Sequence, residues 1–453
     1  MINMKQVSLF LLCFLASLFA NAQNSTLISG PWAGNVELRT ATIWLEVSPQ
    51  VKSVSINYYD TAQPKKMAAA VYKGILGQPF NPLKIELNGL QMATTYQYEV
   101  IIDGKSVKVP FNTRFTTKDL WQWRKPAPDF SFLTGSCAYF NEPEFDRPGK
   151  PYGGDLTIFE TMATTPAQFH LWLGDNWYTR EVDYSSAWGL NYRASHDRAI
   201  PSLQALMASM PQYAIWDDHD YGPNDAGKSY IFKQDSRRVF NSYFLNPTAG
   251  ENEQGIYTQF SYGDVDFFLT DDRYFRAEED LVDSINGQPN FEKTYFGPQQ
   301  LSWLKNALLF SRATFKVIVT GSQLLNPLNK YECMQHYPYE YNELMSFLKS
   351  QKINGVLFLT GDRHHSEVIR MNRDDAYPLF DITVSPYTSG VSKASGQEAT
   401  NPFREPGTLV ETQNFGHISV SGIKNERELK INFLGTKGET LGTWKVSEKE
   451  LKY

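Results

Sequence analysis

Five short apolar runs in this sequence end beside residues that can bind metal ions or activate a substrate. The runs, each with the first such residue after it, are 130–133 with Cys137, 169–173 with Asp175, 213–216 with Asp217, 265–269 with Asp271, and 355–359 with Asp362. In a layered α/β protein, runs of this kind are buried strands, and ligands bind outside the carboxyl ends of such strands. Acidic, cysteine, histidine and tyrosine side chains gathered there point to a metal-assisted hydrolase.

The second run leads into Gly-Asp-Asn-Trp-Tyr, which contains Asp175 and Tyr178. A carboxylate at a strand end, with an oxygen donor three residues later, can hold a cation from two directions. A carboxylate that bridges two cations is the usual device of binuclear hydrolases, and a tyrosine phenolate suits ferric iron. The alternative is that Asp175 caps a helix and Tyr178 packs below it.

The fifth run leads into Gly-Asp-Arg-His-His. Alternation along an extended tip aims Asp362 and His364 at one site and turns Arg363 away. A lone histidine is more often structural, but the neighbouring strand-end aspartate favours metal ligation by His364. We expect His365 and Glu367 to orient the ligand imidazole.

The third run leads into the turn 216–225, which holds four aspartates, His219 and Asn224. So many polar side chains cannot all be buried without partners. A solvated acidic loop is one explanation. Cations in the same crevice are the other, because they would neutralise the charge of Asp217, Asp218 and their neighbours.

Two cysteines lie beyond the N-terminal segment, Cys137 and Cys333. They could pair in an oxidising compartment. We favour metal ligation by Cys137, because it follows a strand beside the other candidate ligands. Cys333 has no such setting and is interpreted as a small core residue.

Residues 1–22 have the pattern of a Sec-type secretory signal, with Lys5, an apolar run over 7–19 and the small-residue site Ala20-Asn21-Ala22. The apolar run is too short to span a bilayer, so we expect no transmembrane anchor and a periplasmic or secreted protein. The chain has 453 residues, enough for two domains, and a formal net charge of −6. That charge gives no basic surface for nucleic acid.

Short β-rich runs separated by turn residues predict a β-sandwich over 24–117, and the proline-containing stretch 125–128 marks a junction. From 128 to 453, strands alternate with helices, expected over 202–210, 298–311 and 341–352. The last runs, 416–421, 428–434 and 441–446, alternate like antiparallel strands. We expect them to complete a second sheet.

Four ordered motifs resemble those of the alkaline phosphatase D family of calcineurin-like metallophosphoesterases. They are Gly-Ser-Cys at 135–137, Leu-Gly-Asp-Asn-Trp-Tyr at 173–178, Trp-Asp-Asp-His-Asp-Tyr-Gly-Pro-Asn-Asp at 216–225, and Gly-Asp-Arg-His at 361–364. The resemblance runs from about Asp129 to the C-terminus. It implies an α/β fold in which an immunoglobulin- or fibronectin III-like sandwich precedes a four-layer α/β/β/α domain.

The resemblance also implies a metal centre of ferric iron (Fe3+) and calcium (Ca2+), with Asp175 bridging. Its ligands would be Cys137, Asp175, Tyr178 and His364 at the iron, and Asn224 and Asp362 at the second cation. The chain departs from better-known members at 220–225, where they carry a Glu-Val stretch and paired asparagines. It also lacks their twin-arginine signal, so metal loading would follow export.

The expected function is hydrolysis of a small or polymeric phosphate ester by a secreted monomer. The candidate catalytic residues are His219, Asp218, Arg273 and Arg363. His219 would protonate the leaving oxygen or bind the phosphate, and each arginine either contacts phosphate or forms a structural ion pair. A phospholipase or wall-polymer phosphodiesterase on the same centre is one alternative, and a non-catalytic glycan-binding protein is another. Aromatic side chains that could stack on a substrate occur in two loops: Phe145, Tyr152, Phe291 and Tyr295.

Overall fold

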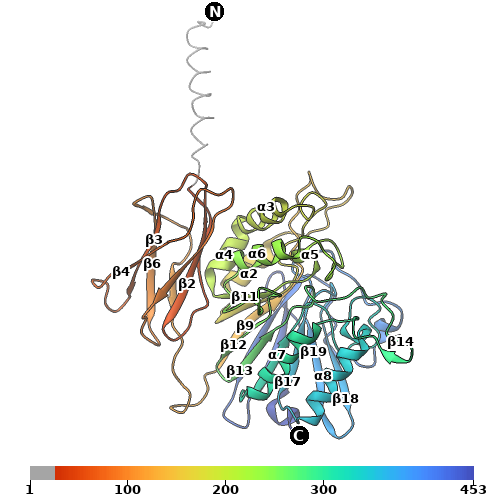
Figure 1. Cartoon of the computed structure of the whole chain (residues 1–453). Coiled ribbons are helices and arrows are strands. Elements are labelled where there is room, and N and C mark those ends of the chain that lie inside the picture. Colours follow the sequence, from red (N-terminus) through yellow and green to blue (C-terminus); the bar gives the residue numbers. More distant parts are fainter. Residues whose placement is uncertain (1–25) are drawn as a thin grey trace, which may run out of the picture.

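The computed structural model describes residues 26–453, which form an N-terminal β part and a larger α/β part (Figure 1). The signal-like residues 1–22 lie outside the described residues. The N-terminal part has a three-stranded sheet, β1-β2-β5, and a five-stranded sheet in which β8 joins β4-β3-β6-β7. Its strands are β1 (Leu27–Gly34), β2 (Thr40–Val47), β3 (Val54–Asp60), β4 (Ala68–Val71), β5 (Pro82–Asn88), β6 (Thr95–Ile102), β7 (Lys105–Val107) and β8 (Arg114–Thr116).

Alternating apolar residues account for this N-terminal part. In β5, Leu83, Ile85 and Leu87 are buried while the residues between them are exposed, so one face of the strand covers a core shared by both sheets. The expected strands over 40–47, 54–59, 83–87 and 95–102 are present, but the run 111–116 forms a strand only from residue 114. Strands β1, β4 and β7 were not predicted.

Two six-stranded sheets form the α/β part, in the orders β11-β10-β9-β20-β21-β22 and β12-β13-β16-β17-β19-β18. In the first sheet β11, β10 and β9 are parallel and β20 pairs antiparallel with β9, whereas the centre of the second sheet, β13-β16-β17-β19, is parallel. Aromatic rings of β9 and β13 meet between the sheets, with Phe132 and Phe267 centroids 5.2 Å apart. The strands are β9 (Phe130–Gly135), β10 (Phe169–Leu173), β11 (Gln212–Ile215), β12 (Thr258–Tyr262), β13 (Val265–Leu269), β16 (Phe315–Val319), β17 (Val356–Thr360), β18 (Glu367–Arg373), β19 (Ala376–Thr383), β20 (Asn414–Ser421), β21 (Glu428–Gly435) and β22 (Thr440–Ser447).

Helices cover the two outer faces, which confirms the expected α/β fold class. Figure 1 shows α2, α3, α4 and α6 on one side and α7 and α8 on the other. The helices are α2 (Thr157–Thr164), α3 (Ala187–Arg198), α4 (Pro201–Ser209), α5 (Asp218–Tyr221), α6 (Lys233–Tyr243), α7 (Gly297–Phe310) and α8 (Pro338–Ser350). The three helices expected from sequence are α4, α7 and α8, and each has a proline in its first turn.

The C-terminal strands correct one expectation. We expected them to complete a second sheet, but β20 pairs antiparallel with β9 and extends the first sheet. The second sheet is completed instead by β18 and β19, which follow β17 directly. Which sheet a late strand joins depends on long-range pairing, which its alternating pattern does not specify.

The N-terminal part packs against α3 and α6. Trp44 stacks on Trp32 at 4.1 Å and donates its indole proton to the Ser242 carbonyl at 2.7 Å. Buried Glu46 of β2 accepts hydrogen bonds from Ser195 of α3 and Tyr243 of α6. These contacts fix the first part beside the helices that cover the first sheet.

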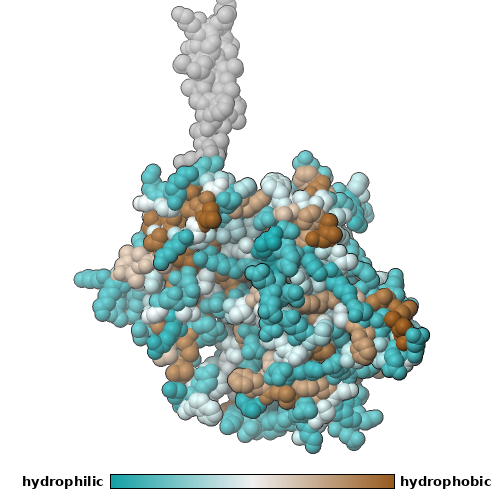
Figure 2. All heavy atoms as spheres, viewed as in Figure 1, coloured by the Kyte–Doolittle hydropathy of each residue, from teal (hydrophilic) through white to brown (hydrophobic). Residues whose placement is uncertain are grey.

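No helix within residues 26–453 has the length and apolarity needed to cross a membrane. The face drawn in Figure 2 is mainly hydrophilic, with small hydrophobic groups. One such group lies at the right edge, over the hairpin β14 (Ser284–Ile285) and β15 (Gln288–Pro289), where Ile285 is exposed.

The carboxyl ends of β9, β10, β11 and β17 meet at one edge of the paired sheets. Gly174, with φ of 96°, lets β10 turn there, and a Cβ at this position would lie 2.5 Å from the Cβ of Asp217. Only glycine allows so close an approach in that backbone conformation. The candidate site is built at this edge.

Candidate metal centre

Three residues from three strand ends form what we call the first group: Cys137, Asp175 and His364. Their ligand atoms all lie within 4.8 Å of one another, and Cys137 Sγ is 3.6 Å from Asp175 Oδ2. The fourth candidate for this position, Tyr178, is buried, with its hydroxyl 3.5 Å from His364 Nε2. The structure therefore brings all four residues expected at the iron to one place.

Left-handed backbone occurs at four of the candidate ligands. Their φ angles are 63° at Cys137, 53° at Asp175, 65° at Asp362 and 57° at His364. Such values are uncommon outside glycine and cost conformational energy, which proteins tolerate mostly at functional sites. Since Asp175 lies in a turn that no helix follows, the helix-cap alternative for this residue is wrong.

A second group shares Asp175 and adds Asp218 and His219 from α5, again with ligand atoms within 4.8 Å of one another. Asp175 Oδ1 accepts a 3.3 Å hydrogen bond from the His219 backbone, and His219 Nε2 lies 3.8 Å from Asp218 Oδ2. A carboxylate common to two adjoining groups has the position that a bridging ligand needs.

A third group, which the sequence did not reveal, joins Asp217, Asp218 and Glu332. Glu332 comes from the loop between β16 and α8, and the guanidinium of Arg273 lies between it and Asp217. Arg273 Nε donates to Asp217 Oδ1 at 2.6 Å and Nη1 donates to Glu332 Oε1 at 2.7 Å. Arg273 is fully buried, so it has the structural ion pair rather than the phosphate contact.

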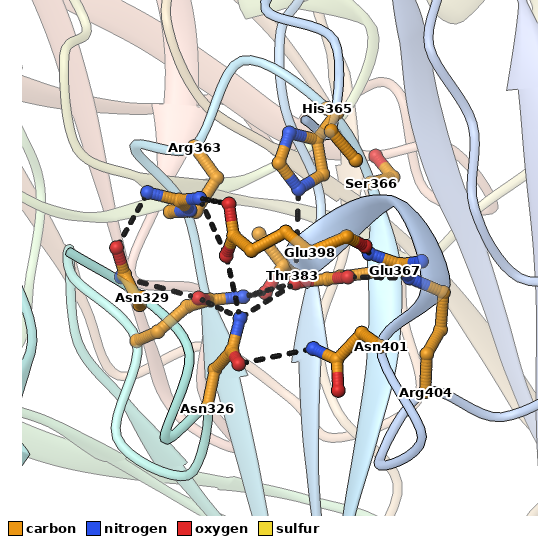
Figure 3. A network of polar contacts seen from close by, with 12 residues as sticks. Asn326, Asn329, Arg363, His365, Ser366, Glu367, Thr383, Glu398, Asn401 and Arg404 are labelled. Carbon is orange, nitrogen blue, oxygen red and sulfur yellow. Dashed lines mark hydrogen bonds and ion pairs between the residues drawn. The ribbon is translucent and has the colours of Figure 1, made fainter. Parts of the chain in front are cut away.

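Arg363, like Arg273, forms a structural ion pair. It donates to Asn329 at 2.6 Å and to both oxygens of Glu398, at 2.9 and 2.7 Å (Figure 3). The side chain is nearly buried in this network. The geometry therefore favours a structural role, in which Arg363 holds the loop that carries Asp362 and His364.

The orientation of His364 differs from what we expected. Its Nδ1 lies 2.7 Å from the Gly390 carbonyl, which can only accept, so Nδ1 carries the proton and Nε2 is left for a metal. His365 and Glu367 do not orient it. Figure 3 shows them in the neighbouring buried network, with His365 Nε2 3.7 Å from Glu367 Oε1.

Asn224 lies at the exposed end of the turn that follows α5. The backbone of the next residue, Asp225, donates to Asp218 Oδ2 at 2.9 Å, which ties this turn to the second group. Asn224 itself lines the adjoining cavity with Tyr178 and His219. Its role as a ligand stays a prediction.

Electrostatics provides a test of whether these residues suit cations. Burial, Asp218 and Cys137 raise the pKa of Asp175 well above its ordinary range. Burial and Glu332 raise the pKa of Asp362 to about 6, and burial and Asp362 raise the pKa of the Cys137 thiol to about 11. Crowded buried acids of this kind are costly unless positive charge compensates them, so the donor set fits metal ions.

The pKa of His219, the histidine of the second group, is lowered rather than raised. Nearby carboxylates favour the protonated form of a histidine. Asp218 does so, but burial outweighs it and lowers the pKa of His219 below its ordinary value. In the structure the imidazole of His219 is stacked on the ring of Tyr178, with centroids 4.1 Å apart.

The remaining candidates from the sequence are Asp271, a possible disulfide and four loop aromatics. Asp271, after the fourth run, accepts hydrogen bonds from Trp216 and from the backbone of Arg273 and so stabilises its own loop.

Both cysteines are free and buried, so the disulfide alternative is wrong. Of the four loop aromatics, Phe145 and Tyr152 line the cavity beside the groups, Tyr295 is buried in the core, and Phe291 packs on Tyr339.

Solved structures share this arrangement of paired sheets. A structure of PhoD matches with a TM-score of 0.72 and 18% identity, over 93% of this chain and 90% of that one. Purple acid phosphatase PPD1 from yellow lupin (Lupinus luteus) seeds matches with a TM-score of 0.66 and 10% identity, over 92% and 74%. At these identities the likenesses establish the fold alone, a layered α/β fold.

Sequence comparison identifies the family. A family model described as PhoD-like phosphatase matches residues 132–433, and one described as a domain of unknown function (DUF7800) matches residues 24–120. The chain belongs to the PhoD-like phosphatase family, which confirms the resemblance seen in its motifs. Alkaline phosphatase D of Bacillus subtilis (strain 168) is 25% identical over 335 residues, 64% of this chain. The chain spans about half, 54%, of that relative's length.

Proposed function

We propose that this protein is a metal-dependent phosphoric ester hydrolase. One observation carries the proposal: two adjoining groups of ligand atoms share the buried carboxylate of Asp175. Phosphatases commonly clamp a phosphoryl group between two cations held in this way. Membership of the PhoD-like phosphatase family supports the same activity.

The candidate ligands in and beside the two groups would hold different cations. Cys137, Tyr178 and His364 offer sulfur, phenol and imidazole donors, a set that suits Fe3+. Asp218 and Asp362 offer carboxylate oxygens, which suit Ca2+. Asp175 would bridge the two. When bound, such cations act as Lewis acids toward the phosphate ester and lower the pKa of water.

The other side chains keep these donors in place and handle the leaving group. Arg273 neutralises Asp217 and Glu332 beside the second group, and Arg363 holds the loop of His364. His219 lines the cavity, and its Nδ1 has no hydrogen-bond partner among the described residues. It is positioned to bind the phosphate or to pass a proton to the leaving oxygen.

The setting of this activity is also part of the proposal. The signal-like residues 1–22 support action in the periplasm or outside the cell. We propose that the remaining chain divides into a sandwich domain over 24–117 and a catalytic domain over 128–453. Two core clusters support this division, although Trp32 and Trp44 of the sandwich pack in the larger one.

Purified protein assayed with p-nitrophenyl phosphate and bis(p-nitrophenyl) phosphate tests the activity. We expect hydrolysis of at least one ester, loss of that hydrolysis in a chelator, and recovery after Fe3+ and Ca2+ are added. Asp175→Asn should remove activity, whereas Asp374→Asn, at an exposed position in the β18–β19 turn, should not. Hydrolysis that persists in both the chelator and Asp175→Asn would contradict the proposal.

A further inference from the structure

A cavity of about 820 Å³ opens directly beside the metal centre. The loop over residues 139–152 forms much of its wall, and Tyr178 and His219 form its inner end. A phosphate group fills only a small part of such a volume, which is in the range of sites for drug-sized ligands. The remaining space adjoins the position where a leaving group would extend from the bound phosphate.

One wall of this cavity is a continuous line of aromatic rings. From the rim inward, ring centroids are 4.9 Å apart between Tyr152 and Tyr139, 5.0 Å between Tyr139 and Tyr178, and 4.1 Å between Tyr178 and His219. Phe145 adds a further ring to the lining. Tyr152 is 46% exposed, so its ring is available to a ligand. The contacts of Tyr139 with Tyr152 and Tyr178 are edge-to-face, with interplanar angles of 77° and 61°, so the ring that offers a surface for a flat apolar group to stack on is that of Tyr152 at the rim.

Hydrogen bonds hold this wall in position. Asn141 and Gly153 bond reciprocally, at 2.8 and 2.9 Å, and close the loop at its base. The backbone of Gly154 donates to the Thr388 carbonyl at 2.6 Å, and the Tyr152 hydroxyl lies 3.1 Å from His364 Nδ1. The loop is therefore already built against the metal centre, and a ligand would find a preformed wall.

The charges of the cavity balance. Three acidic and three basic side chains line it, so it has no net charge: Glu144, Asp146, Glu181, Arg147, Lys150 and Arg180. Four of them are paired, Arg180 with Asp146 at 2.9 Å and Arg147 with Glu181 at 3.3 Å. A polyanionic chain would therefore gain little electrostatic attraction in this cavity. An uncharged leaving group needs no such attraction and suits the cavity better.

We propose that this cavity is a leaving-group subsite for phosphate esters whose leaving group is uncharged and carries a planar aromatic ring, with a nucleoside as the fitting size. The phosphate lies at the metal centre, and the ring stacks on Tyr152 and Phe145. This inference rests on the proposed function, because it names the substrate class of the same site.

The test compares two esters with the same leaving oxygen, adenosine 5′-monophosphate and ribose 5-phosphate, which differ by the base alone. Each competes with whichever p-nitrophenyl ester the metal-loaded protein hydrolyses. Base–aromatic stacking favours the nucleotide by about tenfold or more in Ki. Tyr152→Phe should keep this preference. Tyr152→Ala and Phe145→Ala should bring the two Ki values together by weakening the nucleotide alone.

Phe310→Ala is the matched control, since that ring is 81% exposed at the end of α7. It should leave both Ki values unchanged. Melting temperatures of all variants check that they fold. Equal Ki values for the two esters in the wild-type protein would overturn the subsite while leaving the proposed function intact. Absence of hydrolysis of both nitrophenyl esters would overturn the proposed function, and the subsite with it.

Discussion

Glu46 makes the contact between the N-terminal part and the helices sensitive to pH. The side chain is 1% exposed, and its Oε1 accepts from Ser195 at 2.9 Å and from Tyr243 at 3.1 Å. Its Oε2 has no hydrogen-bond partner, and no ion pair reaches it from the described residues. Burial raises the pKa of Glu46 to about 7. Glu46→Gln keeps an oxygen acceptor and removes the ionisation.

The size of the effect follows from linkage. The folded protein binds this proton more tightly than the unfolded chain, whose carboxyl has a pKa near 4.5. The contribution of protonated Glu46 to the free energy of unfolding is therefore complete below pH 4.5. It is lost as pH rises toward 7, where Glu46 ionises in the folded state. At about 1.4 kcal/mol for each pH unit, the loss reaches about 3 kcal/mol by pH 8.

Urea denaturation at pH 4.5 and pH 8 measures this. Between pH 4.5 and pH 8, the free energy of unfolding should fall by about 3 kcal/mol more in the wild-type protein than in Glu46→Gln. Glu86→Gln, exposed on the neighbouring strand β5, is the matched control and should behave like wild type. If wild type and Glu46→Gln change in parallel with pH, Glu46 is not a buried acid and the reasoning fails.

Three further predictions concern the metal centre. Cys137→Ser should remove thiolate-to-iron absorption from the visible spectrum of metal-loaded protein, and an unchanged spectrum would exclude Cys137 as a ligand. Arg273→Met should cost about 3–5 kcal/mol in urea denaturation, because Asp217 and Glu332 lose their buried partner; a stable variant with only a raised KM would indicate a phosphate contact. His219→Ala should slow alkyl esters about 10²–10⁴-fold and nitrophenyl esters less. Equal losses would assign His219 to phosphate binding.

The sequence predicted those parts of the site that local chemistry defines. Cys137, Asp175 and His364 each follow an apolar strand, and the carboxyl ends of parallel strands meet at one edge. The same reasoning placed the central strands and the proline-started helices within a few residues. Both follow from burial patterns that depend only on neighbouring residues.

The rest depends on long-range contacts. Glu332 reaches the centre from a loop with no strand or motif before it, and Gly390 contributes only a backbone carbonyl, so neither leaves a signal in the sequence. Asp271 has the same strand-end pattern as Asp175 but bonds to its own loop. The placement of β20 beside β9 is likewise set by pairing across the whole domain.

The metal content of purified protein, with and without Asp175→Asn, tests the central claim most directly. Elemental analysis should find two metal ions per wild-type chain, because two ligand groups adjoin at Asp175. Asp175→Asn should lower both, since a bridging ligand serves two ions. Asp374→Asn should lower neither. Wild-type protein that holds no stoichiometric metal after loading, or Asp175→Asn that retains both ions, would contradict this account.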